Sequence, residues 1–224
     1  MTFPSNGSNE SGAHLGLHSS IFMLGFEADV VRTYFELNGF LVRSAGSPPE
    51  AGKKKTGTVP TLAVFNPDAP ANAVDSGFRL FTTDVVRIRA ALVSIVGWES
   101  SPFSADFLRS DARLLSFIKS EVTSKRLESG FSPLVSLPEA RMGDFLRLVV
   151  LPSLPRGEDK LRQSMDLIRE AGAEGVYTFR VMLENLLGRA ESGRDYSKYH
   201  SMQALRILKC YGLATEPQLE LFKE

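Results

Sequence analysis

The stretch Ala90–Trp98 constrains the fold of this chain more than any other part of the sequence. Seven of its nine residues are apolar and three are β-branched, which is typical of a strand buried on both faces of a sheet. A helical pattern precedes it, because Asp84, Val85 and Ile88 share one face, and a second helix is expected after Glu99. Such a strand between two helices belongs near the centre of a sheet covered by helices. The sequence therefore predicts an α/β fold with a central mixed β-sheet flanked by helices.

The composition argues against several classes of protein. The chain has 224 residues, of which 43% are hydrophobic and 23% are charged, as in ordinary globular proteins. Lys plus Arg and Asp plus Glu number 26 each, so no global field favours nucleic acid or an anionic membrane. The one cysteine, Cys210, cannot form an internal disulfide and suits a reducing compartment. We find neither an apolar run of about 20 residues, as a membrane span needs, nor a signal-peptide pattern, and we expect a cytoplasmic protein without a membrane partner.

The distribution of apolar residues divides the chain into three regions. Residues 1–20 are rich in Ser, Gly and Asn and are expected to form a flexible arm. Residues 21–155 are expected to form the α/β core, and residues 156–224 a helical region that packs on it. The strands predicted in the core are Phe40–Ser44, Val59–Phe65, Ala90–Trp98, Phe131–Leu137 and Phe145–Pro152. The core helices are expected at the stripe Phe26, Val30, Tyr34 and Leu37, from about Asp84, and over roughly Ser110–Leu127, closed by Gly130.

The order of the first elements carries functional information. A helix bearing Glu27 precedes Asn38-Gly39-Phe40, and the strands around Thr61–Phe65 and Val93–Trp98 follow, with a helix after them. This order resembles the core of the PD-(D/E)XK nuclease-like superfamily. The resemblance implies a restriction-endonuclease-like core over roughly residues 20–125. It also implies a site in which carboxylates hold a divalent metal such as Mg²⁺ and a lysine orients the attacking water.

The residues at the positions that the resemblance assigns to catalysis differ from the family pattern. Glu27 would be the acid on the first helix. Thr61, or alternatively Leu62, stands where the resemblance requires an Asp, and Ser94 and Val96 stand where it requires an (Asp/Glu)-x-Lys pair. Thr and Ser are weak Mg²⁺ ligands and Val cannot orient water. Glu99, at the mouth of the central strand, is the candidate for a displaced ligand; alternatively, Glu27 is a helix-dipole acid and the hydroxyls are structural.

The C-terminal region contains three helical stripes and a set of basic residues. The stripes are Leu161, Met165 and Ile168; Phe179, Leu183 and Leu187; and Ala204, Ile207, Leu208 and Tyr211. Basic residues interleaved with tyrosines can follow a phosphate backbone, and the candidates for nucleic-acid contacts are Arg194, Lys198, Arg206 and Lys209. The alternative is a solvated helix face whose Leu, Ile and Tyr side docks on the sheet.

Together these features predict a non-catalytic, degenerate nuclease-like domain that binds nucleic acid, DNA in particular, or a protein partner. One alternative is an active metal-dependent nuclease with rearranged ligands. Another is a protein-interaction scaffold that works as a homodimer through its helical end. No metal site and no cofactor are expected, because the three histidines are scattered and no phosphate-binding glycine motif is present. Only the nuclease alternative would require Mg²⁺.

Overall fold

The computed structural model describes residues 25–45, 59–69, 77–98, 103–131 and 145–215. The predicted arm over residues 1–20, Glu99 and all but the first residue of the predicted strand Phe131–Leu137 lie outside these ranges. Phe131 itself is the last residue of a helix. No helix among the described residues is long and apolar enough to cross a membrane.

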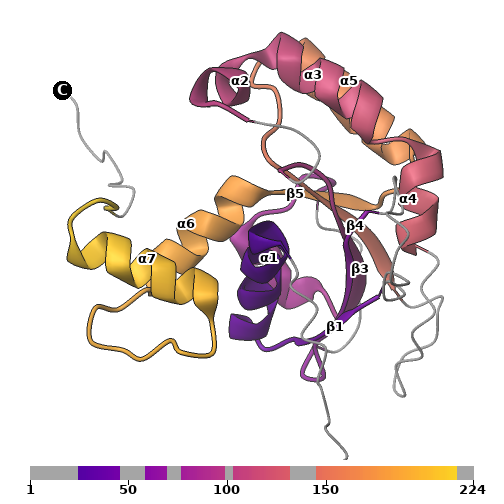
Figure 1. The fold of residues 1–224 in the computed structure, drawn as a ribbon. Helices are drawn as coiled ribbons and strands as arrows, with labels where there is room; N and C mark the ends of the chain where they lie inside the picture. Colours follow the sequence, from indigo (N-terminus) through magenta and orange to yellow (C-terminus); the bar gives the residue numbers. More distant parts are fainter. Residues whose placement is uncertain (1–24, 46–58, 70–76, 99–102, 132–144, 216–224) are drawn as a thin grey trace, which may run out of the picture.

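A five-stranded mixed sheet forms the middle of the fold (Figure 1). Its strands are β1 (Leu41–Ser44), β2 (Thr61–Phe65), β3 (Ala90–Ile95), β4 (Leu146–Leu151) and β5 (Gly175–Thr178), and they lie side by side in that order. The first three strands pair antiparallel, whereas β3, β4 and β5 run parallel. The carboxyl ends of three neighbouring strands therefore meet at one edge of the sheet.

Helices cover both faces of this sheet, as predicted (Figure 1). One face is covered by α1 (Phe26–Leu37), α6 (Phe179–Arg189) and α7 (His200–Cys210), which share a core with the strands. The other face is covered by α3 (Asp111–Glu121), α4 (Ser124–Phe131) and α5 (Glu158–Glu170). Two short helices complete the fold, the 3-10 helix η1 (Thr82–Arg87) and α2 (Ala105–Arg109). The result is a three-layer α/β/α arrangement with two large hydrophobic cores and a third, small cluster of Ala45, Ala63 and Leu92.

The central strand has the character that its sequence predicts. All six residues of β3 are buried, and alternate side chains enter different cores. Val93 and Ile95 face α1, whereas Leu92 faces the opposite side. One expectation is wrong: Trp98, three residues beyond the strand and expected to be buried, is 42% exposed.

Several elements differ from the sequence-based expectation. The helix expected from Asp84 is the 3-10 helix η1, and the helix expected over Ser110–Leu127 is two helices separated at Val122 and Thr123. Gly130 does not end a helix but lies inside α4. The strand β5 was not predicted, because the region after Pro155 was expected to be helical throughout.

The first residue of β5 is a closely packed glycine. A Cβ at Gly175 would lie 2.9 Å from both Leu148 Cδ2 and Leu80 Cδ1, so a larger residue would require these leucine side chains to shift. The segment around Phe78–Leu80 bonds to Val176 on the outer side of β5. The edge of the parallel half of the sheet is thereby covered, which removes a site for unwanted strand pairing.

Candidate functional site

The two hydroxyl residues that stand at the nuclease-like positions are paired with each other. Thr61 begins β2 and lies opposite Ser94 of β3 in the antiparallel register. Both are buried, their hydroxyl oxygens lie 3.1 Å apart in a hydrogen bond, and Thr61 Oγ1 also donates to the carbonyl of Val59 at 3.2 Å. Each of the two hydroxyl protons can thus be donated to an oxygen within the protein.

Helix α4 closes the space above this pair. A Cβ at Gly130 would lie 2.5 Å from Thr61 Oγ1 and 2.7 Å from Ser94 Oγ, distances that real side chains do not tolerate. The backbone of α4 therefore packs directly on the two hydroxyls. A hydrated Mg²⁺ ion, which keeps several waters, has no room between them and the helix.

Glu27 lies on the other side of the sheet. It sits in the first turn of α1 and is 5% exposed. Helix α1 packs on Leu62 and Val93, and because side chains alternate along a strand, the adjacent Thr61 and Ser94 point away from it. The sheet thus separates Glu27 from the Thr61–Ser94 pair.

The carboxylate of Glu27 has a clear structural contact. Its Oε2 accepts a hydrogen bond of 2.8 Å from the backbone N–H of Trp98. This contact joins the start of α1 to the chain that leaves the central strand. It holds Trp98 at the carboxyl edge of β3, where many α/β proteins bind ligands.

The remaining candidates at this edge are apolar or lie outside the described residues. Val96 is buried in the core beneath α3 and α5 and cannot orient water. The ring of Trp98 contacts Phe103 and Phe179, with centroids 5.1 Å and 6.5 Å away. The position of Glu99 is not described. Among the described residues, no group of three or more His, Cys, Asp or Glu side chains could hold a metal ion.

Two of the four predicted nucleic-acid contacts are bonded to the protein itself. Arg206 Nε donates to the carbonyl of Ser192 at 2.8 Å, and Lys209 Nζ donates to the carbonyl of Leu187 at 3.3 Å. Both side chains are half-buried. They stabilise the end of α6 and the segment that connects it to α7.

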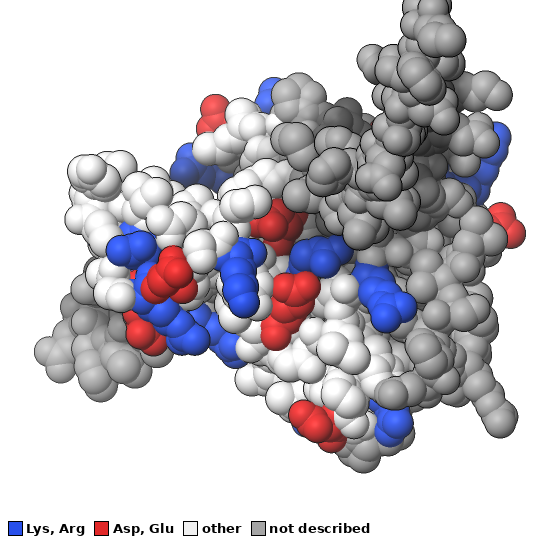
Figure 2. All heavy atoms as spheres, turned by 60° about the horizontal axis from the view of Figure 1, so that its bottom comes forward, with Lys and Arg blue, Asp and Glu red and all other residues white. Residues whose placement is uncertain are grey.

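The other two candidates are exposed on that connecting segment. The Arg194 guanidinium lies 5.8 Å from the centre of the Tyr196 ring, and Lys198 is exposed on the same segment. The hydroxyl of Tyr196 donates to the carbonyl of Arg189 and accepts from the N–H of Glu191, so the segment has a fixed shape. Positive and negative side chains alternate over the face in Figure 2, without a large area of one sign.

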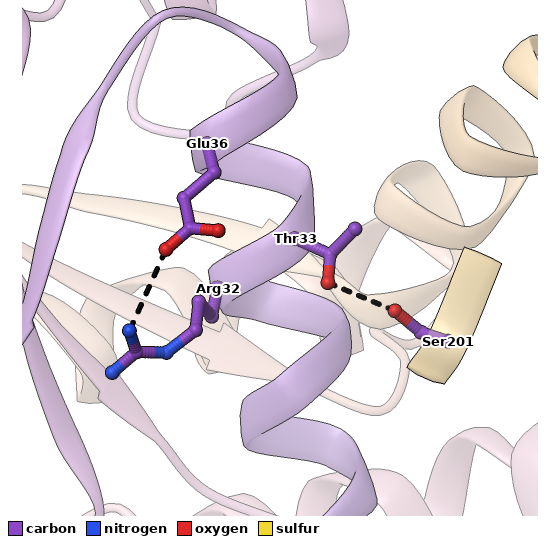
Figure 3. Close-up of polar contacts among 4 residues, drawn as sticks. All are labelled: Arg32, Thr33, Glu36 and Ser201. Carbon is purple, nitrogen blue, oxygen red and sulfur yellow. Dashed lines mark hydrogen bonds and ion pairs between the residues drawn. The ribbon is translucent and has the colours of Figure 1, made fainter. Parts of the chain in front are cut away.

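Polar contacts fix α7 against α1. Ser201 Oγ donates to Thr33 Oγ1 at 2.9 Å, and both residues are buried (Figure 3). The carboxylate of Asp29 accepts a hydrogen bond of 2.9 Å from the N–H of Ser201 and so caps the first turn of α7.

An ion pair lies on another side of α1, where Arg32 and Glu36 are 3.5 Å apart (Figure 3). Despite this pairing, partial burial raises the pKa of the Glu36 carboxyl above its ordinary value.

The apolar stripe of α7 has the opposite orientation to the one expected. Ile207, Leu208 and Tyr211 are exposed. Met202 and Leu205 are the residues that pack against α1 and α6. The interpretation that the Leu, Ile and Tyr side docks on the sheet is therefore wrong.

Comparison with known proteins gives no family. No family model matches the chain, and no curated protein or solved structure is significantly similar to it.

Proposed function

We propose that this chain is a non-catalytic, nuclease-like domain that acts as a binding module, with a cytoplasmic location. The order of its elements supports the resemblance: α1 is followed by three strands paired antiparallel, then by helices and the parallel strand β4. The observation that carries the proposal is the Thr61–Ser94 pair, because the positions where the resemblance requires metal ligands hold two bonded hydroxyls beneath Gly130.

The direct test of the non-catalytic role is a cleavage assay. Purified protein with Mg²⁺ or Mn²⁺ is incubated with plasmid, linear and single-stranded DNA, and no cleavage above background is expected. Glu27→Ala is assayed alongside, with circular dichroism to establish that it is folded. Metal-dependent cleavage that Glu27→Ala abolishes in a folded variant would establish the alternative, an active nuclease with rearranged ligands that include Glu27 or Glu99.

Nucleic acid is one class of ligand for this module. The exposed residues Arg194 and Lys198 are the best candidates to contact it. The other two basic candidates are bonded to backbone carbonyls, so two phosphate contacts are expected in place of four. Two contacts imply a slope of about −2 in log affinity against log salt for duplex DNA.

A titration of labelled duplex DNA at several salt concentrations measures this slope. Arg194→Ala with Lys198→Ala should flatten it to near zero without lowering the melting temperature. The matched control is Arg113→Ala with Lys119→Ala, which removes two exposed charges of α3 and should leave the slope unchanged. A slope that both double variants change equally would contradict the assignment to the connecting segment.

The third candidate is a scaffold that forms a homodimer through its helical end. The exposed apolar side of α7 favours a protein ligand of some kind. Analytical ultracentrifugation over a range of protein concentrations measures self-association, and a stable dimer without DNA binding would favour this candidate over the nucleic-acid one.

A further inference from the structure

The pair Asn38–Gly39, which ends α1, combines a reactive sequence with an accessible position. An asparagine that precedes glycine is prone to deamidation, because glycine has no side chain to hinder the approach of its backbone nitrogen to the asparagine side chain. Gly39 is exposed, Asn38 is half-buried, and a Cβ at Gly39 would meet nothing within 4 Å. Neither burial nor crowding therefore protects this pair.

Deamidation would proceed here in two steps that need only water. The backbone nitrogen of Gly39 attacks Cγ of Asn38 and forms a C–N bond, while the bond from Cγ to Nδ2 breaks. The proton of the attacking nitrogen passes through solvent to Nδ2, which leaves as ammonia. Water then opens one of the two C–N bonds of the cyclic imide. The product is aspartate or isoaspartate, in which the backbone continues through the side-chain carbon.

The backbone geometry at Asn38 opposes the first step. Because the peptide bond is planar, ψ sets where the next nitrogen lies, and ψ of Asn38 is 15°. The Gly39 nitrogen therefore nearly eclipses the backbone nitrogen of Asn38 and points away from Cβ, which carries the side-chain carbonyl. The N–H of Gly39 also donates to the carbonyl of Glu36 at 3.1 Å. Attack on Cγ requires this peptide to rotate and this hydrogen bond to break.

The side chain of Asn38 is held from two directions. Its Nδ2 donates to the carbonyl of Tyr34 at 2.7 Å, which satisfies one of the carbonyls at the end of α1. Its Oδ1 accepts a bond of 2.8 Å from Nη2 of Arg189, whose Nη1 donates to the carbonyl of Leu37 at 2.6 Å. Arg189 is the last residue of α6, so one guanidinium joins the carboxyl ends of two helices that pack in the same core.

We propose that Asn38 is a deamidation site that Arg189 holds in an unreactive geometry, so that the reaction occurs only when the contact between α6 and the end of α1 opens. A guanidinium also polarises the amide carbonyl, but this assists attack only when the nucleophile is within reach. Deamidation replaces the donor Nδ2 by an acceptor oxygen that faces the Tyr34 carbonyl, so the closed contact is harder to form again. The proposal does not depend on the proposed function.

The test incubates the full chain in mildly alkaline buffer and follows deamidation by mass spectrometry of its peptides. Arg189→Ala should accelerate the reaction at Asn38 about tenfold or more, because a hydrogen bond to a charged group shifts a local equilibrium by about this factor. The wild-type chain unfolded in urea should react at least as fast as this variant. Arg180→Ala removes an exposed guanidinium of the same helix that pairs with Glu184; it is the matched control and should leave the rate unchanged.

A second variant and an internal reference complete the design. If circular dichroism shows that Arg189→Ala is unfolded, Arg189→Lys takes its place; it keeps the charge but lacks the fork that reaches both oxygens, and it should still react faster than wild type. The other Asn-Gly pair of the chain, Asn6–Gly7, lies outside the described residues and is measured in the same samples.

Three outcomes would overturn the proposal. The first is an equal rate at Asn38 in the folded wild type and in urea, because the fold would then give no protection. The second is an Arg189 variant that reacts at the wild-type rate or more slowly, because the guanidinium would then be neutral or would activate the carbonyl. The third is equal acceleration at Asn38 and Asn6, because the effect would then not be local.

Discussion

The contact between α4 and the Thr61–Ser94 pair can be tested with a single methyl group. Gly130→Ala places a Cβ 2.5 Å from Thr61 Oγ1 and 2.7 Å from Ser94 Oγ. Both oxygens are buried on strands that are paired on both sides, so neither can move away freely. The new methyl group must displace α4 or break the hydrogen bond between the hydroxyls.

The expected change in stability combines three contributions. Overpacking of a buried site costs about 1–3 kcal/mol, and loss of the hydrogen bond costs about 1 kcal/mol. Replacing glycine by alanine within a helix offsets up to about 1 kcal/mol. Gly130→Ala is therefore expected to destabilise the protein by about 1–3 kcal/mol. For a chain of this size, this lowers the melting temperature by about 2–12 °C.

A change of background should reverse the sign of this effect. In Thr61→Ala with Ser94→Ala both hydroxyls are absent, and the methyl group of Gly130→Ala fits the space they leave. The helix propensity then remains as the main contribution, and Gly130→Ala should stabilise that background by about 0.5–1 kcal/mol. Urea unfolding of the four proteins gives the coupling energy, expected to be about 2 kcal/mol or more.

The control is Gly188→Ala on α6, where a Cβ meets nothing within 4 Å. It should stabilise the wild-type protein by about 0.5–1 kcal/mol. The reasoning is refuted if Gly130→Ala stabilises the wild type as much as Gly188→Ala does. In that case α4 does not close the space above the hydroxyls, and the argument against a metal ion there fails with it.

Three further substitutions test other parts of the structure. Val93→Asp buries an unpaired carboxylate beneath α1 and should cost about 4 kcal/mol or more; a variant that still melts cooperatively near the wild-type temperature would contradict the central-strand assignment. Bonds from the N–H groups of Arg156 and the next residue lower the pKa of Asp111, so its carboxylate stabilises the fold above about pH 5 and progressively less below about pH 4; Asp111→Asn should melt lower than wild type at pH 7, and the difference should shrink towards pH 2. Burial raises the pKa of Glu36 despite Arg32, so its ionisation weakens the fold as the pH rises above about 4.3; Glu36→Gln should melt modestly higher at pH 7 and equal to wild type near pH 3, and a lower melting temperature at pH 7 would show that the ion pair outweighs burial.

The α/β class could be predicted because the apolar run at Ala90–Ile95 has only one stable place. A strand with all six residues buried must have neighbours on both edges and helices on both faces. Strand β5 gave no such signal, since its four residues are too few for a periodicity and the first of them is a glycine. It pairs with β4, where Gly175 lies opposite Leu148, a contact between distant parts of the chain.

The sequence could predict which residues stand at the candidate site, but not how their side chains are oriented. Element order indicated Glu27, Thr61 and Ser94, and the structure has the latter two in register on adjacent strands. Which face of the sheet each side chain occupies depends on the exact strand register, and an error of one residue reverses the face. Gly130 is predicted from the sequence only as the end of a helix, and its close packing on Thr61 and Ser94 leaves no local signal.

The orientation of α7 shows where periodicity stops being informative. The spacing of Ile207, Leu208 and Tyr211 indicates that one side of the helix is apolar, and the usual inference is that this side faces the core. Here the buried side is held by Met202 and by polar contacts of Ser201 with Thr33 and Asp29. Hydrogen bonds between buried groups far apart in sequence leave no periodic pattern. A helix can therefore be anchored through its polar residues while its apolar side stays exposed.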